Sequence, residues 1–253
     1  MKSILVILSI LYTSLGISQN TIHYTSVSET LLENIIQEKP INAQLAILEN
    51  ASLESLINEL NTDSKKIAFW INIYNAFIQI ALKEDPESYQ DKSRFFSTKR
   101  IKIAEENLSF DEIEHGILRK SKLKISLGYL RKPFPAEWER KLRVDQVDWR
   151  IHFALNCGAK SCPAVTVYHS QNLSMELDYM TTEFLRNNTE FNKENGVAKV
   201  TSLFSWFRAD FGGISEIKKI LKNYDVTPIE PSSLEFTKYD WGLSLNNYIS
   251  IPN

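Results

Sequence analysis

The sequence contains little cysteine, glycine or proline and has no long uninterrupted hydrophobic run. Its 253 residues include 2 cysteines, 8 glycines and 8 prolines. Two cysteines are too few for a small disulfide-stapled scaffold, and with one nearby histidine they lack the ligand number and spacing of a zinc site. No tract is rich in glycine, proline or serine, so no linker divides the chain. We therefore expect a single domain with no metal and no cofactor.

The hydrophobic runs are all shorter than the roughly 18 residues that a membrane-spanning helix needs. The chain begins with MKSILVILSILYTSLGISQN, in which one basic residue precedes a short apolar stretch and small residues. This pattern is typical of a secretory signal peptide. We expect residues 1–18 to be this signal and residues 19–253 to be one globular domain. The mature protein would be exported, periplasmic or extracellular, with no integral membrane span.

Neither sign of charge dominates the chain. Lys and Arg number 29, Asp and Glu 31, and the formal net charge is −2. Such a balance gives no general attraction to nucleic acid. Basic residues gather between Arg119 and Arg143, which is most simply a solvated face, although an acidic glycan is an alternative partner. The expected partner is a small polar ligand, a peptide or a glycan.

Hydrophobic periodicity predicts an α+β fold, with a mostly helical N-terminal half and a small sheet in the second half. The predicted helices cover residues 27–60 (broken by Pro40), 65–83, 111–120, 135–143, 173–185 and 213–224. The predicted strands or extended segments cover residues 122–130, 147–155, 164–168 and 234–239.

One predicted helix is free of charge. The segment from Ile67 to Leu82, IAFWINIYNAFIQIAL, has no charged residue in 16 positions, and a helix that is apolar nearly all round is normally buried. Its amide side chains Asn72, Asn75 and Gln79 share one face because they are three and four residues apart. Buried amides need hydrogen-bond partners. This stripe therefore tethers neighbouring loops or forms a wall of a site; solvent exposure is the third alternative.

The stretch FDEIEHGILRK, residues 110–120, places Asp111, His115 and Arg119 at intervals of four on a short helix. A carboxylate beside an imidazole raises the pKa of the imidazole and fixes its tautomer. That arrangement suits a general base and equally a simple ion pair. Glu114 diverges from His115 by about 100° on an α-helix, so it is not expected to pair with it.

Both cysteines lie in IHFALNCGAKSCP, residues 151–163. Cys157 and Cys162 could form a disulfide, which export permits. They could instead be inert core thiols, since unpaired cysteine is among the most buried residue types. Cys157 could also be a nucleophile. The spacing alone leaves these three interpretations open.

As a nucleophile, Cys157 would follow a strand and precede a turn at Gly158, which would free backbone N–H groups for an oxyanion. The base would be a histidine. His152 is five residues away, so in a regular strand the two side chains face opposite sides. His115 is therefore the favoured base and His152 the alternative.

Five motifs resemble a known family. They occur in this order between residues 65 and 246: AFWINIYNAF, FDEIEHGILR, RIHFALNCGAKSCPAVTVY, FSWFRADFG and YDWGLSLN. With them the chain resembles the family named domain of unknown function 547, whose members keep the first cysteine, while many lack the second. The resemblance implies a common site without naming its reaction. Its motif residues in this sequence are Asn72, Asn75, His115, Arg119, His152, Cys157 and Gly158.

Two functional hypotheses follow. The favoured one is a thiol-dependent hydrolase or transferase that acts on amide or ester bonds without a cofactor, because thiol, imidazole and carboxamide groups on separate segments are what a convergent site needs. Its catalytic residues would be Cys157, His115 or His152, and Asn72 or Asn75, with Arg119, Gln79 and Gly158 binding substrate. The alternative is a non-catalytic module that binds a glycan or peptide and carries a structural Cys157–Cys162 disulfide.

Overall fold

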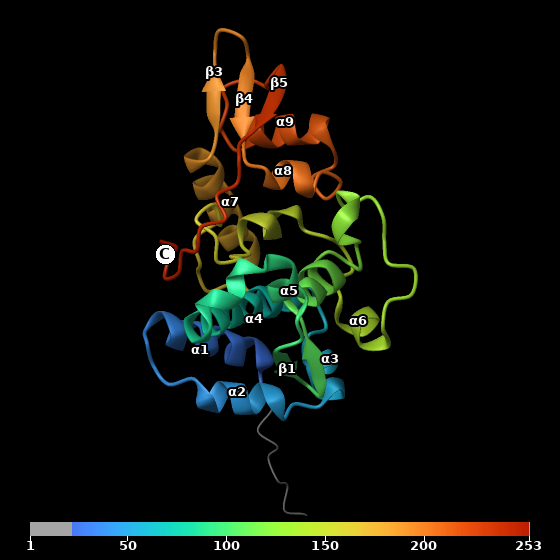
Figure 1. Cartoon of the computed structure of the whole chain (residues 1–253). Coiled ribbons are helices and arrows are strands. Elements are labelled where there is room, and N and C mark those ends of the chain that lie inside the picture. The colour runs from blue at the N-terminus through green and yellow to red at the C-terminus, as the bar shows by residue number, and fades with distance from the viewer. Residues whose placement is uncertain (1–21, 253) are drawn as a thin grey trace, which may run out of the picture.

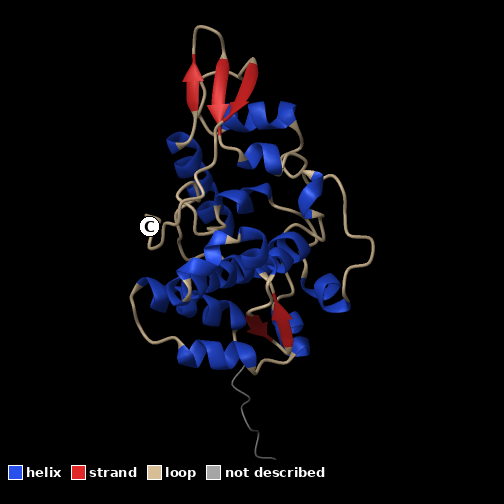
Figure 2. Cartoon of the chain, in the orientation of Figure 1, coloured by secondary structure: helices blue, strands red, loops and turns tan. Residues whose placement is uncertain are grey.

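The computed structural model describes residues 22–252, so the predicted signal peptide lies outside the described residues. The α+β prediction is confirmed: helices dominate the N-terminal half, and a three-stranded sheet lies in the second half (Figure 2). Within residues 22–252, no helix combines the length and the apolar character needed to cross a membrane.

The N-terminal helices gather around one long central helix (Figure 1). Helix α1 (Tyr24–Ile36) packs along α4 (Asp63–Glu84) and against α2 (Asn42–Glu49), and α3 (Leu53–Glu59) precedes α4 in the chain. Pro40 separates α1 from α2, as predicted, because proline cannot continue a helix.

Helix α4 contains the charge-free segment and forms the centre of the larger hydrophobic cluster. It begins at a capping residue, Thr62, whose hydroxyl accepts a hydrogen bond from the N–H of Lys65 at 3.3 Å. Asp63 in the first turn complements the positive end of the helix dipole. Pro86 follows the last turn and opens the next element.

Short elements connect α4 to the second half of the chain. They are η1 (Pro86–Gln90), α5 (Lys92–Ser97), the hairpin of β1 (Ile101–Ile103) and β2 (Glu106–Leu108), the π-helix η2 (Glu112–Leu118), the 3₁₀ turns η3 (Lys124–Ser126) and η4 (Trp149–Phe153), and α6 (Glu137–Leu142). The β1–β2 hairpin was not predicted. These elements carry ionisable side chains that lie beside α4.

The second half contains a small sheet covered by helices (Figure 1). Its elements are α7 (Leu173–Asn187), β3 (Glu190–Asn192), β4 (Val197–Val200), α8 (Leu203–Trp206), α9 (Ile214–Asn223) and β5 (Ser233–Phe236). Strand β4 is central, antiparallel to β3 and parallel to β5. The C-terminal segment then returns past the cysteine loop, where isolated bridges pair Ala159 with Leu243 and Val165 with Tyr248.

Two of the predicted strands are wrong because local turns replace them. In residues 122–130 the backbone turns through positive φ values of 51° at Leu127 and 86° at Gly128, and the side chain of Ile125 is 92% exposed. In residues 147–155 the carboxylate of Asp148 accepts a hydrogen bond from the N–H of Arg150 at 3.0 Å and thereby caps η4. The predicted segment 164–168 forms an isolated bridge and no strand.

Two hydrophobic clusters make up the core. One surrounds α4, and the other lies beneath the three-stranded sheet. Cys157 is half-buried and packs against both clusters. The fold therefore brings the loop that carries Cys157 to the junction of the two clusters.

Candidate active site

A cavity of about 280 Å³ opens at this junction. Its walls come from α4, α5, η2, η3, η4, the cysteine loop, α8 and the C-terminal segment. The lining residues are Tyr74, Phe96, Asp111, Glu114, His115, Lys124, His152, Leu155, Cys157, Pro163, Leu203, Trp206, Phe207, Tyr239 and Trp241. Cys157 and His152, from one motif, and His115, from another, thus share one cavity. Among the described residues, no cluster of three or more His, Cys, Asp or Glu is arranged to hold a metal ion.

The cavity thiol is free. Cys157 and Cys162 are not bonded to each other, so the structural disulfide of the alternative hypothesis is absent from this structure. The hydroxyl of Tyr239 lies 3.4 Å from Sγ of Cys157 and 3.2 Å from Sγ of Cys162. The N–H of Cys157 donates to Sγ of Cys162 at 3.0 Å. One phenol and one backbone group therefore hold the two sulfurs together.

The two thiols differ in acidity. A hydrogen bond from the Cys162 thiol lowers the pKa of Cys157; burial opposes this shift, and the Tyr239 hydroxyl and the N–H of Ala159 reinforce it. Burial raises the pKa of Cys162 well above its ordinary value. Since the thiolate is the nucleophilic form of cysteine, Cys157 is the more reactive of the pair.

Gly158 shapes the cysteine loop and is absent from the cavity lining. Its φ is +86°, and a Cβ on it would lie 2.4 Å from Cδ1 of Leu82. Its N–H donates to Oδ1 of Asn156 at 2.9 Å, while Nδ2 of Asn156 donates to the carbonyl of Pro163 at 2.7 Å. Gly158 therefore permits a tight turn against α4 that aims Cys157 at the cavity.

His115 lies on the π-helix η2, a type of helix that is rare and frequent at functional sites. Nη1 of Arg119 lies 2.9 Å from Nδ1 of His115, and Oδ1 of Asp111 lies 3.6 Å from its Nε2. A guanidinium can only donate, so Nδ1 accepts and the ring proton is on Nε2. Glu114, which α-helical spacing places elsewhere, also approaches, with Oε1 3.5 Å from Nδ1.

The protonation of His115 differs from the sequence-based expectation. A neighbouring carboxylate was expected to raise its pKa. Instead burial, together with the positive charges of Arg119 and Lys124, holds the pKa of His115 well below its ordinary value. His115 is therefore a neutral imidazole that presents an N–H donor.

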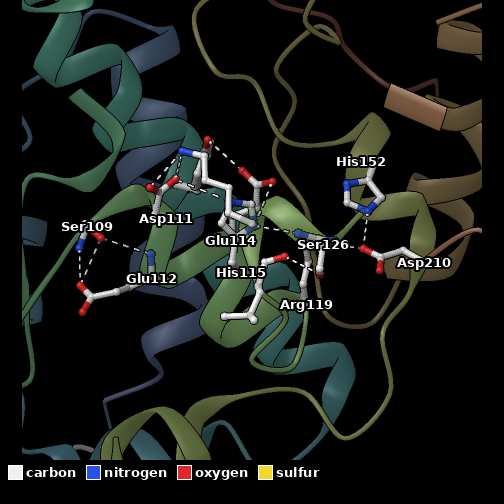
Figure 3. A network of polar contacts seen from close by, with 12 residues as sticks. Ser109, Asp111, Glu112, Glu114, His115, Arg119, Ser126, His152 and Asp210 are labelled. Atoms are coloured by element: carbon white, nitrogen blue, oxygen red, sulfur yellow. Dashed lines mark hydrogen bonds and ion pairs between the residues drawn. The ribbon is translucent and has the colours of Figure 1, made fainter. Parts of the chain in front are cut away.

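Arg119, expected to bind an anionic substrate group, does not reach the cavity. Its side chain is 0% exposed, and its Nε donates to Oδ2 of Asp210 at 2.6 Å. The other carboxylate oxygen of Asp210 accepts from Nζ of Lys122 at 2.7 Å. Figure 3 shows the resulting series of contacts from His115 through Arg119 and Asp210 to His152. The anionic group that Arg119 binds is therefore the carboxylate of Asp210 and not a group of the substrate.

His152 ends this series. Its Nε2 lies 2.9 Å from Oδ2 of Asp210, and its ring stacks on Phe207 with centroids 3.9 Å apart. Burial lowers the pKa of His152 to about 4, although the hydrogen bond with Asp210 opposes the shift. Burial would raise the pKa of Asp210, but hydrogen bonds from His152 and Arg119 hold it well below its usual range. Neutral His152 therefore donates to an ionised carboxylate, which leaves Nδ1 as an acceptor.

Glu114 was not selected from the sequence, yet it lines the cavity. Burial raises its pKa to about 7, with Arg119 opposing the shift and the negative charge of Asp111 adding to it. The hydroxyl of Tyr74 donates to Oε2 of Glu114 at 3.4 Å. A cavity carboxyl that titrates near neutrality is suited to proton transfer.

The asparagines of α4 hold backbone segments and do not line the cavity. The carboxamide of Asn72 donates to the carbonyl of Tyr168 at 2.8 Å and accepts from the N–H of Tyr168 at 2.9 Å. The carboxamide of Asn75 donates to the carbonyl of Ala154 at 3.0 Å and accepts from the N–H of Asn156 at 2.8 Å. Both asparagines have 0% exposure, and Asn75 fixes the chain immediately before Cys157.

Gln79 continues the same stripe toward the C-terminal segment. Its Oε1 accepts from the hydroxyl of Tyr248 at 3.3 Å and from the N–H of Asn246 at 3.4 Å. Gln79 is 1% exposed and is absent from the cavity lining. The three amides of α4 therefore tether neighbouring segments of the chain, which is one of the three alternatives that the sequence left open.

Sequence reasoning missed two further site residues, Tyr239 and Asp210. Tyr239 contacts both sulfurs, and Asp210 joins η2 to η4 through Arg119 and His152. Both lie in motifs that carry the family resemblance, Tyr239 in YDWGLSLN and Asp210 in FSWFRADFG. Their partners are more than 50 residues away in sequence, so no local spacing rule could pair them.

No curated protein and no solved structure matches this chain. A family model does match, over residues 57–185, which include α4, η2, η4 and the cysteine loop. The chain therefore belongs to the family described as "Protein of unknown function, DUF547".

Proposed function

We propose that this protein is a cysteine-dependent hydrolase or transferase that acts on amide or ester bonds, with Cys157 as its nucleophile. The observation that carries the proposal is the setting of the Cys157 sulfur. It lines a cavity, is half-buried, and has a pKa lowered by donors from Cys162, Tyr239 and the Ala159 backbone. A reactive cysteine needs this combination of access and thiolate stabilisation.

Glu114 is the proton-transfer group in this proposal. A general acid or base works best when its pKa lies near the operating pH. Glu114 has a pKa of about 7, whereas the pKa of His152 is about 4 and that of His115 lies well below its ordinary value. The two imidazoles, favoured from the sequence as bases, are better suited to hydrogen bonding.

The proposed reaction then has two halves. The Cys157 thiolate attacks the carbonyl carbon, the Nε2–H of His115 stabilises the developing oxyanion, and protonated Glu114 gives its proton to the departing amine or alcohol. In the second half, ionised Glu114 takes a proton from water or another acceptor nucleophile, which attacks the thioester. The carboxylic acid or transferred acyl product leaves, and the Cys157 thiolate and protonated Glu114 are regenerated.

The walls of the cavity favour a small apolar or ring-shaped group. Trp206, Tyr239 and Trp241 form an aromatic wall, with Trp206 and Trp241 stacked at a centroid distance of 5.7 Å. A volume of about 280 Å³ is at the lower end for ligand pockets. We expect the cavity to hold one group of a larger substrate.

The same aromatic wall favours a second candidate, a glycan-binding module. Trp241 is 36% exposed, and aromatic faces with polar edges combine apolar contact with hydrogen bonding. This candidate predicts glycan binding that survives Cys157→Ala and is lost in Trp241→Ala. In either case we propose that the protein is exported, as the sequence of residues 1–18 indicates.

The test is acyl capture. Purified protein is mixed with p-nitrophenyl esters of increasing acyl size, quenched in acid and mapped by mass spectrometry. The proposal expects an acyl group on Cys157, none in Cys157→Ala, and normal labelling in Lys160→Ala, an exposed neighbour in the same loop. Glu114→Gln should accumulate the thioester because water loses its base. Ester turnover that survives Cys157→Ala would remove the proposal.

A further inference from the structure

The two cysteines form a pair whose geometry goes beyond acyl chemistry. They are separated by four residues and converge on one hydroxyl, that of Tyr239, at 3.4 Å and 3.2 Å. The N–H of Cys157 also points at Sγ of Cys162 across 3.0 Å. A mechanism that proceeds through a thioester needs only one thiol. The acyl chemistry proposed above therefore does not explain why Cys162 lies beside Cys157.

The loop between the cysteines is held by hydrogen bonds to the C-terminal segment and by one within the loop. The N–H of Lys160 donates to the carbonyl of Gly242 at 2.8 Å, and the N–H of Asp240 donates to Oγ of Ser161 at 2.9 Å. The N–H of Cys162 donates to the carbonyl of Ala159 at 3.0 Å. The loop and the segment carrying Tyr239 are thus joined, and the sulfurs are held in place before any reaction begins.

The two sulfurs differ in access. Cys157 is half-buried and lines the cavity, whereas Cys162 is 5% exposed and is absent from the cavity lining. The hydrogen bonds that lower the pKa of Cys157 and the burial that raises the pKa of Cys162 sharpen this difference. An accessible attacking thiol beside a sheltered second thiol is suited to two-step thiol–disulfide exchange, in which the second thiol resolves the mixed disulfide.

We propose that Cys157 and Cys162 act as a dithiol pair that reduces small disulfides entering the aromatic cavity, an activity separate from the acyl chemistry proposed above. The Cys157 thiolate attacks one sulfur of R–S–S–R, the S–S bond breaks, and one thiolate leaves and takes a proton from solvent. Cys162 then releases its proton, and its sulfur attacks Sγ of the mixed disulfide on Cys157. The second thiolate leaves with that proton. Two electrons pass to the substrate, which becomes two thiols, while the pair becomes one internal disulfide.

The experiment uses the reduced full-length protein and oxidised glutathione as the disulfide. After an acid quench, intact mass and peptide mapping report the state of each cysteine. The expected result for the wild type is loss of two hydrogen atoms, a Cys157–Cys162 bond and release of two glutathiones per protein, with little mixed disulfide. Cys162→Ser should stop at a stable glutathione adduct on Cys157, and Cys157→Ser should react much more slowly.

Three results would overturn the proposal: a persistent glutathione adduct on the wild type, reaction starting at Cys162, or no reaction of the folded wild type. The first and third of these results come from the wild type alone, so a variant that fails to fold does not obscure them. Acyl capture on the wild type reports separately. Internal disulfide formation without any acyl adduct would contradict the proposed hydrolase or transferase and support the dithiol pair. An acyl adduct on Cys157 without internal disulfide formation would support the hydrolase or transferase and contradict the dithiol pair.

Discussion

Nε2 of His152 donates to Oδ2 of Asp210 across 2.9 Å, and both side chains are almost completely buried. The same oxygen accepts from Nε of Arg119 at 2.6 Å. A single carboxylate therefore joins η4, which precedes the cysteine loop, to η2, which carries His115. The carboxylate of Asp210 thus links two segments that line the cavity.

Replacing Asp210 by Asn should destabilise the fold strongly. The change keeps the shape of the side chain but leaves the Arg119 charge, at 0% exposure, without its carboxylate. Breaking a buried ion pair in this way costs about 3–5 kcal/mol. Urea denaturation measures the loss. Asp145→Asn is the control, because the Asp145 side chain is 88% exposed in its ion pair with Lys66 and should show no measurable change. Equal stability of the two variants would contradict the claim that Asp210 forms a buried ion pair with Arg119.

Glu114→Gln should change the pH dependence of stability. The pKa of Glu114 is raised from 4.5 to about 7 on folding, so between these values the folded state holds the extra proton. The stabilisation of the folded state that comes from this proton is fully present below about pH 4.5 and is lost as the pH rises through 7. Gln cannot ionise, so the variant should gain on the order of 2–3 kcal/mol relative to wild type between pH 4.5 and 8.

Urea unfolding at several pH values checks this expectation for Glu114. Glu84→Gln, which removes one exposed carboxyl at the end of α4, is the matched control. Parallel pH curves for Glu114→Gln and wild type would show that this carboxyl has an ordinary pKa.

Parts of the fold could be predicted from the sequence because their signals are local. The charge-free run between Ile67 and Leu82, preceded by a capping residue and followed by Pro86, predicts α4 without reference to the rest of the chain. Residues 122–130 alternate like a strand, yet they turn at Gly128. There the alternation is outweighed by contacts that the sequence does not display, such as the N–H of Ala209 bonding to the carbonyl of Leu127.

The site could be predicted only in part. Cys157 and His152 are uncommon residue types in an apolar stretch, and His115 is spaced four residues from Asp111 and from Arg119, so the sequence singles out all three residues. The structure puts all three on one cavity. Glu114 and Tyr239 are common types whose importance depends on burial and on partners far away in sequence. The amide of Asn75 was correctly expected to need a partner, but whether that partner was backbone or a catalytic imidazole depended on the tertiary fold.

Asn72→Ala should lower stability without altering the pH dependence of Cys157 alkylation. Its carboxamide contacts the backbone of Tyr168 and neither sulfur nor imidazole. Two buried backbone groups would lose their partner, which costs about 2–5 kcal/mol in urea denaturation. Asn50→Ala, on an exposed side chain that bonds to the Ala46 carbonyl, is the control and should change stability by less than about 1 kcal/mol. A folded Asn72→Ala protein with a shifted alkylation profile would instead support the catalytic role that the sequence predicted for Asn72.

Gly128→Ala should be more destabilising than Gly196→Ala. Both glycines have positive φ, +86° and +70°, so both substitutions carry backbone strain of about 1–2 kcal/mol. At Gly128 the new Cβ would also lie 2.5 Å from Oδ1 of the buried Asp210 carboxylate, whereas at Gly196 its nearest neighbour is Oγ of the exposed Ser232, at 2.9 Å, which can move. We expect an additional loss of about 1–3 kcal/mol at Gly128. Equal thermal or urea stability would mean that the loop over Asp210 moves aside freely.

The most direct measurement is the rate of Cys157 alkylation by iodoacetamide as a function of pH, with each cysteine followed by peptide mapping. The account predicts a midpoint below the ordinary thiol value of about 8.5, labelling of Cys157 before Cys162, and an upward shift in Tyr239→Phe that is absent from Tyr224→Phe. A Cys157 midpoint at or above the ordinary value, unmoved by Tyr239→Phe, would contradict the claim that the cavity holds an activated thiolate.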